Sequence, residues 1–169
     1  MNDPDRTVPV LVVGVGNAYR RDDGAGLAAA ARLAEAAGAP VRLHDRLADG
    51  TALLETWRGA ETVILLDATR SGAPAGTIHR LTGAPEAIAR LEAHTGASTH
   101  GLGIAEAIAL GAVLRRLPRR LVVIGIEGSC FEHGVGLSPE VGRAVTEAVD
   151  CGLQEIVRVR APYVPGASR

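Results

Sequence analysis

Residues Val8–Gly16 read VPVLVVGVG, a continuous run of apolar and mostly β-branched side chains that ends in glycine. A run of this kind predicts a β-strand buried on both faces, which is typical of the inner strands of a parallel sheet. Two later segments have the same character, ETVILLDA at Glu61–Ala68 and RLVVIGIE at Arg120–Glu127. The three strands indicate a fold built around a parallel sheet that is covered on both sides.

Segments with helical character separate these strands. Asp22–Ala37 is rich in Ala and Leu, and Gly38 follows it as a stop signal. The other predicted helices are Asp49–Arg58, Pro85–Ala93, Ile104–Arg116 and Ser138–Arg158, the last capped by Ser138. Two shorter strands are predicted at Val41–Leu47 and Thr77–Thr82, the second at an edge of the sheet.

This alternation predicts an α/β fold with right-handed crossovers. We expect a single three-layer αβα domain over residues 1–160, with a mainly parallel twisted sheet of about five strands. One of these strands is expected to be an antiparallel or edge strand. Residues 161–169 contain two prolines and are expected to form a mobile C-terminal tail.

Composition excludes several classes of function. The 169 residues carry a net charge of -1 at pH 7 and include only one Trp, two Tyr and one Phe, so a nucleic-acid surface is not expected. Neither a signal peptide nor an apolar run of about 20 residues is present to suggest export or a membrane span. The only cysteines, Cys130 and Cys151, make no disulfide framework. We therefore expect a cytoplasmic protein that acts as a monomer.

Ligands bind to sheets of this kind at the carboxyl ends of the strands. Three polar residues are predicted there: Asp23 in the segment after the first strand, Asp67 at the end of Glu61–Ala68, and His100 in the loop STHG ahead of a helix. Taken singly, each has a structural explanation as a helix start, a loop anchor or a buried histidine. Taken together, two carboxylates and an imidazole would form a site for zinc, nickel, manganese or iron.

Other sites are weaker alternatives. Gly14-Val15-Gly16 resembles the start of a dinucleotide-binding turn, but the third glycine of that pattern is replaced by Tyr19. Cys130 and His133 are close enough in sequence to suggest a thiolate pair, although neighbours on one loop seldom meet in the required geometry. Glu127, at the end of a predicted strand, is expected either to border the site or to anchor a loop.

Four segments in this order resemble the hydrogenase maturation endopeptidases, from Val10 to about Val149. They are VVGVGNAYRRDDGAG, LLDATRSGAPAGTIHRL, STHGLGIAEAIAL and LVVIGIEG followed by GVGLSPEV. The sequence departs from the family at Gly128, where proline is common, and at Arg20-Arg21, where apolar residues are common. Neither departure is expected to touch the site residues.

The resemblance implies that Asp23, Asp67 and His100 are both the metal ligands and the catalytic residues of a metal-dependent hydrolase of the aspartic-type endopeptidase class. It implies that the partner is a nickel–iron hydrogenase large-subunit precursor, which loses a C-terminal extension after nickel insertion. The nickel is expected to be presented by that precursor, with no organic cofactor. Two other functions remain open, a non-catalytic module that binds nickel or the precursor and a nucleotide-binding α/β enzyme.

Overall fold

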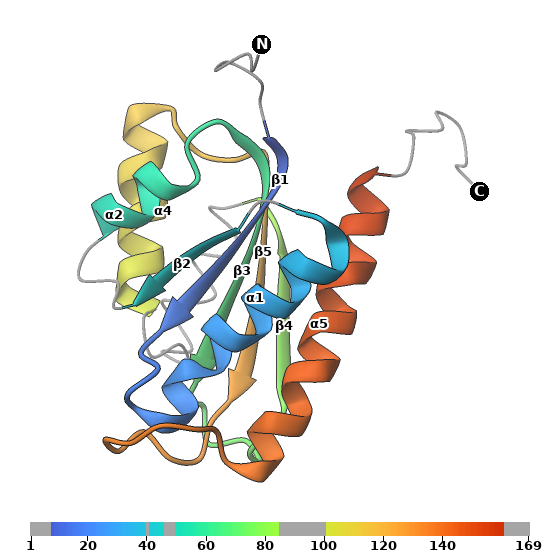
Figure 1. Ribbon diagram of the computed structural model, residues 1–169. Helices are drawn as coiled ribbons and strands as arrows, with labels where there is room; N and C mark the ends of the chain where they lie inside the picture. The colour runs from blue at the N-terminus through green and yellow to red at the C-terminus, as the bar shows by residue number, and fades with distance from the viewer. Residues whose placement is uncertain (1–7, 40, 46–49, 85–100, 161–169) are drawn as a thin grey trace.

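The computed structural model describes residues 8–39, 41–45, 50–84 and 101–160 (Figure 1). Its sheet has five strands in the order β2-β1-β3-β5-β4. The strands are β1 (Val8–Gly16), β2 (Val41–Asp45), β3 (Ala60–Thr69), β4 (Ile78–Gly83) and β5 (Arg120–Glu127). β1, β2, β3 and β5 are parallel, and β4 pairs antiparallel with β5 at the edge. The predicted α/β class and the antiparallel edge strand are confirmed.

Helices cover both faces of the sheet. They are the 3-10 helix η1 (Arg21–Gly24) and the α-helices α1 (Ala25–Ala37), α2 (Gly50–Thr56), α4 (Gly101–Leu114) and α5 (Pro139–Arg160). Figure 1 shows α1 and α5 on one side of the sheet, with α2 and α4 on the other. None of the described helices combines the length and the apolar character that crossing a lipid bilayer requires.

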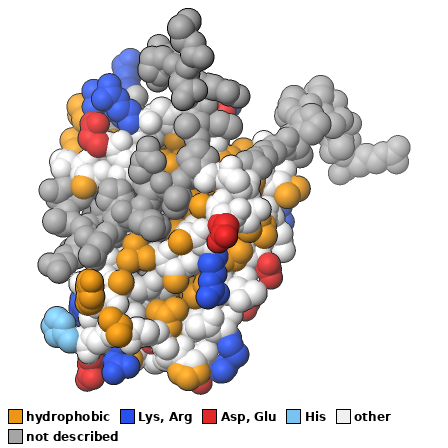
Figure 2. Space-filling view, in the orientation of Figure 1, with side chains coloured by type: hydrophobic (Ala, Val, Ile, Leu, Met, Phe, Trp, Pro, Cys, Tyr) orange, Lys and Arg blue, Asp and Glu red, His pale blue; other side chains and the backbone are white. Residues whose placement is uncertain are grey.

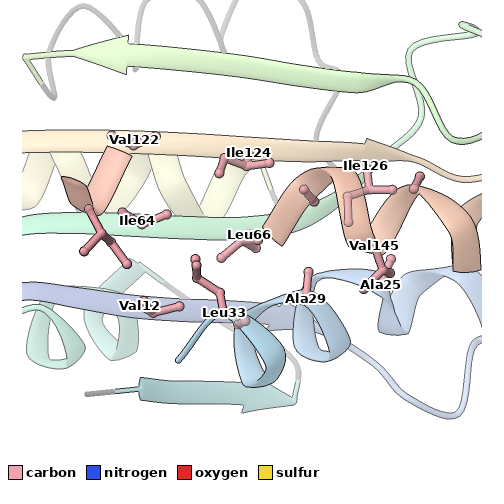
Figure 3. Packing of buried hydrophobic residues seen from close by; sticks show 14 of the residues in the cluster. Val12, Ala25, Ala29, Leu33, Ile64, Leu66, Val122, Ile124, Ile126 and Val145 are labelled. Atoms are coloured by element: carbon pink, nitrogen blue, oxygen red, sulfur yellow. The ribbon is translucent and has the colours of Figure 1, made fainter. Parts of the chain in front are cut away.

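Alternate residues of the central strands feed two separate cores, because successive side chains of a strand point to opposite faces. On β3, Ile64 and Leu66 pack with α1 and α5, as Figure 3 shows, whereas Val63 and Leu65 pack with α2 and α4. Both faces are thus buried, which explains why the strands read as continuous apolar runs.

Helix α1 approaches the sheet closely at Gly26. A Cβ at this position would lie 2.4 Å from the carbonyl oxygen of Val15, 2.5 Å from that of Leu66 and 2.8 Å from the Cα of Asp67. Only glycine allows this contact. It fixes the start of α1 directly over the ends of β1 and β3.

Two predicted helix starts are wrong. The first α-helix starts at Ala25 rather than Asp22, because residues 21–24 form the 3-10 helix η1, in which Arg21 has a left-handed φ of 47°. Helix α4 already includes Gly101 and Gly103, ahead of the predicted start at Ile104, despite the low helix propensity of glycine.

The other boundaries agree within about two residues, the usual uncertainty of helix and strand ends. The predicted helix Pro85–Ala93 and the tail 161–169 lie outside the described residues.

Candidate active site

Asp67 lies two residues before the end of β3, the central strand of the sheet, and is fully buried. Its Oδ1 accepts a hydrogen bond from the N–H of Ala68 at 2.8 Å, which holds the carboxylate close to its own backbone. By the alternation of β3, Asp67 is on the same face as Val63 and Leu65, the face covered by α2 and α4. The carboxylate therefore belongs to the carboxyl end of the strand, where it was predicted.

Asp23 is 1% exposed and lies in η1, directly after the loop that follows β1. Its carbonyl oxygen accepts the Asn17 N–H at 3.2 Å, and Asn17 Oδ1 accepts the Tyr19 N–H at 2.9 Å. Gly16 has φ 149°, and a Cβ there would lie 1.9 Å from the Asp23 carbonyl oxygen. Gly16 and Asn17 thus form a tight turn that places Asp23 next to the end of β1.

The structure places Asp23 and Asp67 at the same end of the sheet. Helix η1, which contains Asp23, contacts both β1 and β3. Three residues later, Gly26 lies over the Cα of Asp67. Two residues that are distant in sequence are thereby brought to one edge, and sharing of an ion between them stays a prediction.

His100 lies outside the described residues. The helix that follows it in sequence, α4, begins at Gly101 at the carboxyl end of the sheet, as Figure 1 shows. Ala107 and Ile108 of α4 pack on the face to which Asp67 belongs. Within the described part of the chain, no three His, Cys, Asp or Glu side chains form a metal centre. A ligand set that includes Asp23 and Asp67 therefore needs a donor from outside it.

Asp22 has a different role from its neighbour. It is fully buried and accepts hydrogen bonds from the backbone N–H groups of Ser129, Cys130 and Ser138, at 2.7–2.9 Å, and from both serine hydroxyls. Burial acts to raise the pKa of Asp22, but the hydrogen bonds from Ser138, Ser129 and Cys130 outweigh it and hold the pKa below its ordinary value. Asp22 thus ties the loop that contains Asp23 to the loop that precedes α5.

Glu127 forms a second anchor of this kind at the end of β5. Its carboxylate accepts the Thr69 hydroxyl, the Ser71 N–H and hydroxyl, and the Gly72 N–H, and it lies 3.1 Å from His79 Nε2. Burial acts to raise the pKa of Glu127, and the hydrogen bonds from Thr69, Ser71 and Gly72 lower it below its ordinary value. Of the two predicted roles, loop anchoring is the one observed, and the loop it anchors starts three residues after Asp67, at the end of β3.

The rim of the site is formed by two loops that pair with each other. The Gly134 N–H donates to the Tyr19 carbonyl at 2.9 Å, and the Arg21 N–H donates to the Gly134 carbonyl at 3.0 Å. Tyr19 and Val135 are 64% and 71% exposed on this rim. The Arg20 guanidinium lies 3.9 Å from Asp23 Oδ2. The expectation that the arginine pair stays clear of the site residues is therefore wrong for Arg20.

The alternative of a thiolate pair gains no support. Cys130 is half-buried, with its backbone N–H and carbonyl both hydrogen-bonded to Asp22, and His133 is exposed. No hydrogen bond joins the two side chains among those of the described residues. The glycine turn after β1 leads into η1 rather than directly into an α-helix, which also differs from a dinucleotide-binding turn.

Comparisons with known proteins agree on one family. A family model described as "Hydrogenase maturation protease" matches residues 29–155. The hydrogenase expression/formation protein HupD of Rhodobacter capsulatus is 32% identical over 152 residues, which cover 88% of this chain and 70% of the relative. HupD of Thiocapsa roseopersicina is 28% identical over 160 residues, covering 93% of this chain and 70% of that protein.

Solved structures give the same result. The NiFe hydrogenase maturation protease HybD from Thermococcus kodakarensis has a TM-score of 0.72 and 30% identity, covering 86% of this chain and 97% of that chain. The hydrogenase maturating endopeptidase HybD from E. coli has a TM-score of 0.71 and 25% identity, covering 90% of this chain and 93% of that chain. The range matched by the family model includes Asp67 and His100 and begins after Asp23.

Proposed function

The chain belongs to the hydrogenase maturation protease family, and from this premise we propose that it removes the C-terminal extension of a nickel–iron hydrogenase large-subunit precursor after nickel insertion. The observation that carries the proposal is the packing of η1, which contains the buried Asp23, against β3, which contains the buried Asp67. The carboxyl end of an open α/β sheet is also where its ligands bind.

In this proposal the nickel arrives with the substrate and is recognised by Asp23, Asp67 and His100. Carboxylate oxygen and imidazole nitrogen are donors that suit a divalent transition metal. The metal would supply Lewis-acid polarisation of the scissile carbonyl. No organic cofactor is required.

The protein's own groups would position the reactants and move protons. The N–H of Ala68 restrains Asp67, so this carboxylate is presented in one orientation. A carboxylate that is not bound to the metal would take a proton from the attacking water as general base. Water attack then breaks the carbon–nitrogen bond, and the proton passes to the leaving amine. This assignment makes the enzyme an aspartic-type, metal-dependent peptidase.

Substrate contacts outside the reacting centre are assigned to the rim. Tyr19 and Val135 offer exposed apolar surface on two loops that are hydrogen-bonded together next to Asp23. Exposed apolar groups beside a reaction centre fit a protein substrate better than a small polar one. We further assign the protein to the cytoplasm, where its two free, half-buried thiols would stay reduced.

The decisive experiment is processing of a nickel-loaded precursor by the purified protein, followed by mass spectrometry. Asp23→Asn, Asp67→Asn and His100→Gln should each abolish release of the tail, whereas Asp150→Asn, an exposed carboxylate on α5, should process normally. Nickel-free precursor should stay full length. Normal cleavage by all three site variants would refute the site assignment, and a precursor that is bound but never shortened would indicate a non-catalytic module instead.

A further inference from the structure

A cleft opens at the end of the sheet opposite the candidate active site. It lies between the turn after α2 and the segment that joins α4 to β5, and its volume is about 280 Å³. Ala60, in its wall, is seven residues before Asp67 on β3, so the cleft is roughly 20 Å from the site at about 3.3 Å per residue. This is about the volume that nine water molecules occupy in liquid water, which is enough space for a diphosphate group.

Four arginines line this space, which we call the arginine cleft: Arg58, Arg115, Arg116 and Arg119. Glu55 lies 3.1 Å from Arg116 Nη1 and 3.6 Å from Arg58 Nη1, and Glu61 lines the cleft as a second carboxylate. Within the described residues, neither Arg115 nor Arg119 forms an ion pair. Counted over the residues that the structure describes, four positive charges thus face two negative ones. Figure 2 shows basic side chains gathered at the end of the molecule where α4 ends.

The ends of two helices explain only part of this charge. α2 and α4 both terminate at the cleft, and each helix C-terminus carries about half a negative charge, which attracts a cation. Arg119 lies five residues beyond α4. Arg115 has φ 55°, a left-handed conformation in which glycine would cost less. The positive charge therefore exceeds what the helix ends neutralise.

The wall of the cleft also contains a buried tryptophan. Trp57, the only tryptophan of the chain, is 1% exposed and lines the cleft. Its Nε1 has no hydrogen-bond partner among the described residues. That nitrogen is itself buried, so Trp57 contributes to the cleft as part of its apolar wall.

We propose that the arginine cleft binds the phosphate groups of a small molecule. Guanidinium groups offer paired N–H donors that match two oxygens of one phosphate, and several around one cavity can hold a diphosphate. The distance from Asp67 makes this a site separate from the protease centre. It does not depend on the proposed proteolytic function.

The test is calorimetric titration of inorganic pyrophosphate at constant ionic strength, with Trp57 fluorescence as a second signal. The double variant Arg115→Gly/Arg119→Ala removes the two guanidinium groups that have no ion pair in the described part of the chain. Glycine suits the φ of residue 115, so the variant should fold normally. Binding should be saturable with one site per chain. It should weaken tenfold or more in the double variant, since hydrogen bonds to charged groups are the strong ones.

The matched control is Arg143→Ala, which removes an exposed arginine of α5 and should change the Kd less than twofold. Titration of ADP beside pyrophosphate identifies the source, because tighter ADP binding indicates a nucleotide and equal binding indicates the phosphates alone. Equal affinity of the wild-type protein and the double variant would overturn the proposal, as would a signal that sodium chloride reproduces at the same ionic strength. Precursor processing by the double variant should be unchanged.

Discussion

The buried carboxylates at the carboxyl end of the sheet and the exposed arginines of the arginine cleft at the other end lie in different environments. At the carboxyl end, the carboxylates of Asp22, Asp23, Asp67 and Glu127 are at most 2% exposed. At the other end, the four guanidinium groups of the arginine cleft belong to residues that are mostly exposed. A buried charge must be satisfied by fixed partners, whereas an exposed one is solvated and screened. The carboxylates at the carboxyl end are therefore fixed by hydrogen-bond donors, as Glu155 is fixed by three arginines near the start of β5, whereas the guanidinium groups of the arginine cleft stay accessible to a ligand.

The largest expected effect is on catalysis at the carboxyl end. Asp67→Asn should slow precursor processing by about 10³-fold or more, or ~4 kcal/mol of barrier, because it removes a charged group from the reacting centre. Time courses by mass spectrometry measure this. Glu61→Gln is the matched control, since it changes an exposed carboxylate on the same strand at the other end. If both variants process the precursor equally fast, the two ends do not differ in function.

The next effect is on stability. Asp22→Ala should lower the free energy of unfolding by about 3–5 kcal/mol, because it strands three backbone N–H groups that this carboxylate satisfies. The melting temperature, Tm, should fall by roughly 10 °C for a chain of this size. Asp22→Asn, which keeps one acceptor oxygen, should lose about half as much. Asp150→Ala should leave the Tm unchanged, and an equal loss there would remove the distinction between buried and exposed carboxylates.

The close contact of helix α1 with the carboxyl end of the sheet can be tested by adding a methyl group at Gly26. Gly26→Ala should cost about 3 kcal/mol, because the added Cβ meets backbone atoms of β1 and β3 at 2.8 Å or less and the helix must move. Gly142→Ala on α5 is the opposite case, with no atom within 4 Å of the added carbon. It should raise stability by about 0.5–1 kcal/mol, through helix propensity alone. Chemical denaturation of both variants measures the contrast.

A smaller effect should follow acidification. The folded-state pKa values of Asp22 and Glu127 lie below their ordinary values of 3.8 and 4.5, so both residues add stability above those values. That stability should be lost as the pH falls from about 4.5 through the lowered pKa values. The slope of unfolding free energy against pH should flatten in Asp22→Asn. An unchanged slope would mean that the pKa of Asp22 does not differ between the folded and unfolded protein.

The smallest effect is expected at the arginine end. Arg115→Gly should raise the free energy of unfolding by about 1 kcal/mol. Residue 115 has a left-handed φ, which is unfavourable for a residue with a Cβ atom and not for glycine. Thermal unfolding without added phosphate measures the gain, with Arg116→Gly, which places glycine outside the left-handed region, as control. A loss of stability in Arg115→Gly would show that this guanidinium contributes to the fold.

Much of the sheet is predictable from sequence because both of its faces are buried. β1 and β5 match their predicted ranges, since a doubly buried strand leaves an uninterrupted apolar run with clear ends. The start of α1 is not predictable in this way. The residues before it form η1, which hydrogen-bonds through Asp22 to Cys130, more than a hundred residues away, and such a distant contact leaves no local signal.

The candidate site shows the same limit. Asp22 and Asp23 are adjacent and chemically identical, so the sequence alone cannot show that Asp22 is the anchor. His79 carries no motif, and its contact with Glu127 follows only from the antiparallel pairing of β4 beside β5. Asp67 was easier to find, because the end of a buried strand is a position the fold class itself marks.

The contacts of Asp22 limit the order in which the protein can fold during its synthesis. A ribosome releases Asp22 early, but two of its partners, Ser129 and Ser138, lie 107 and 116 residues further along the chain. The turn that holds Asp23 in place is therefore completed only when the beginning of the last helix has emerged. All five strands have therefore been synthesised before the contacts of Asp22 can form. We expect the candidate active site to be completed late in folding.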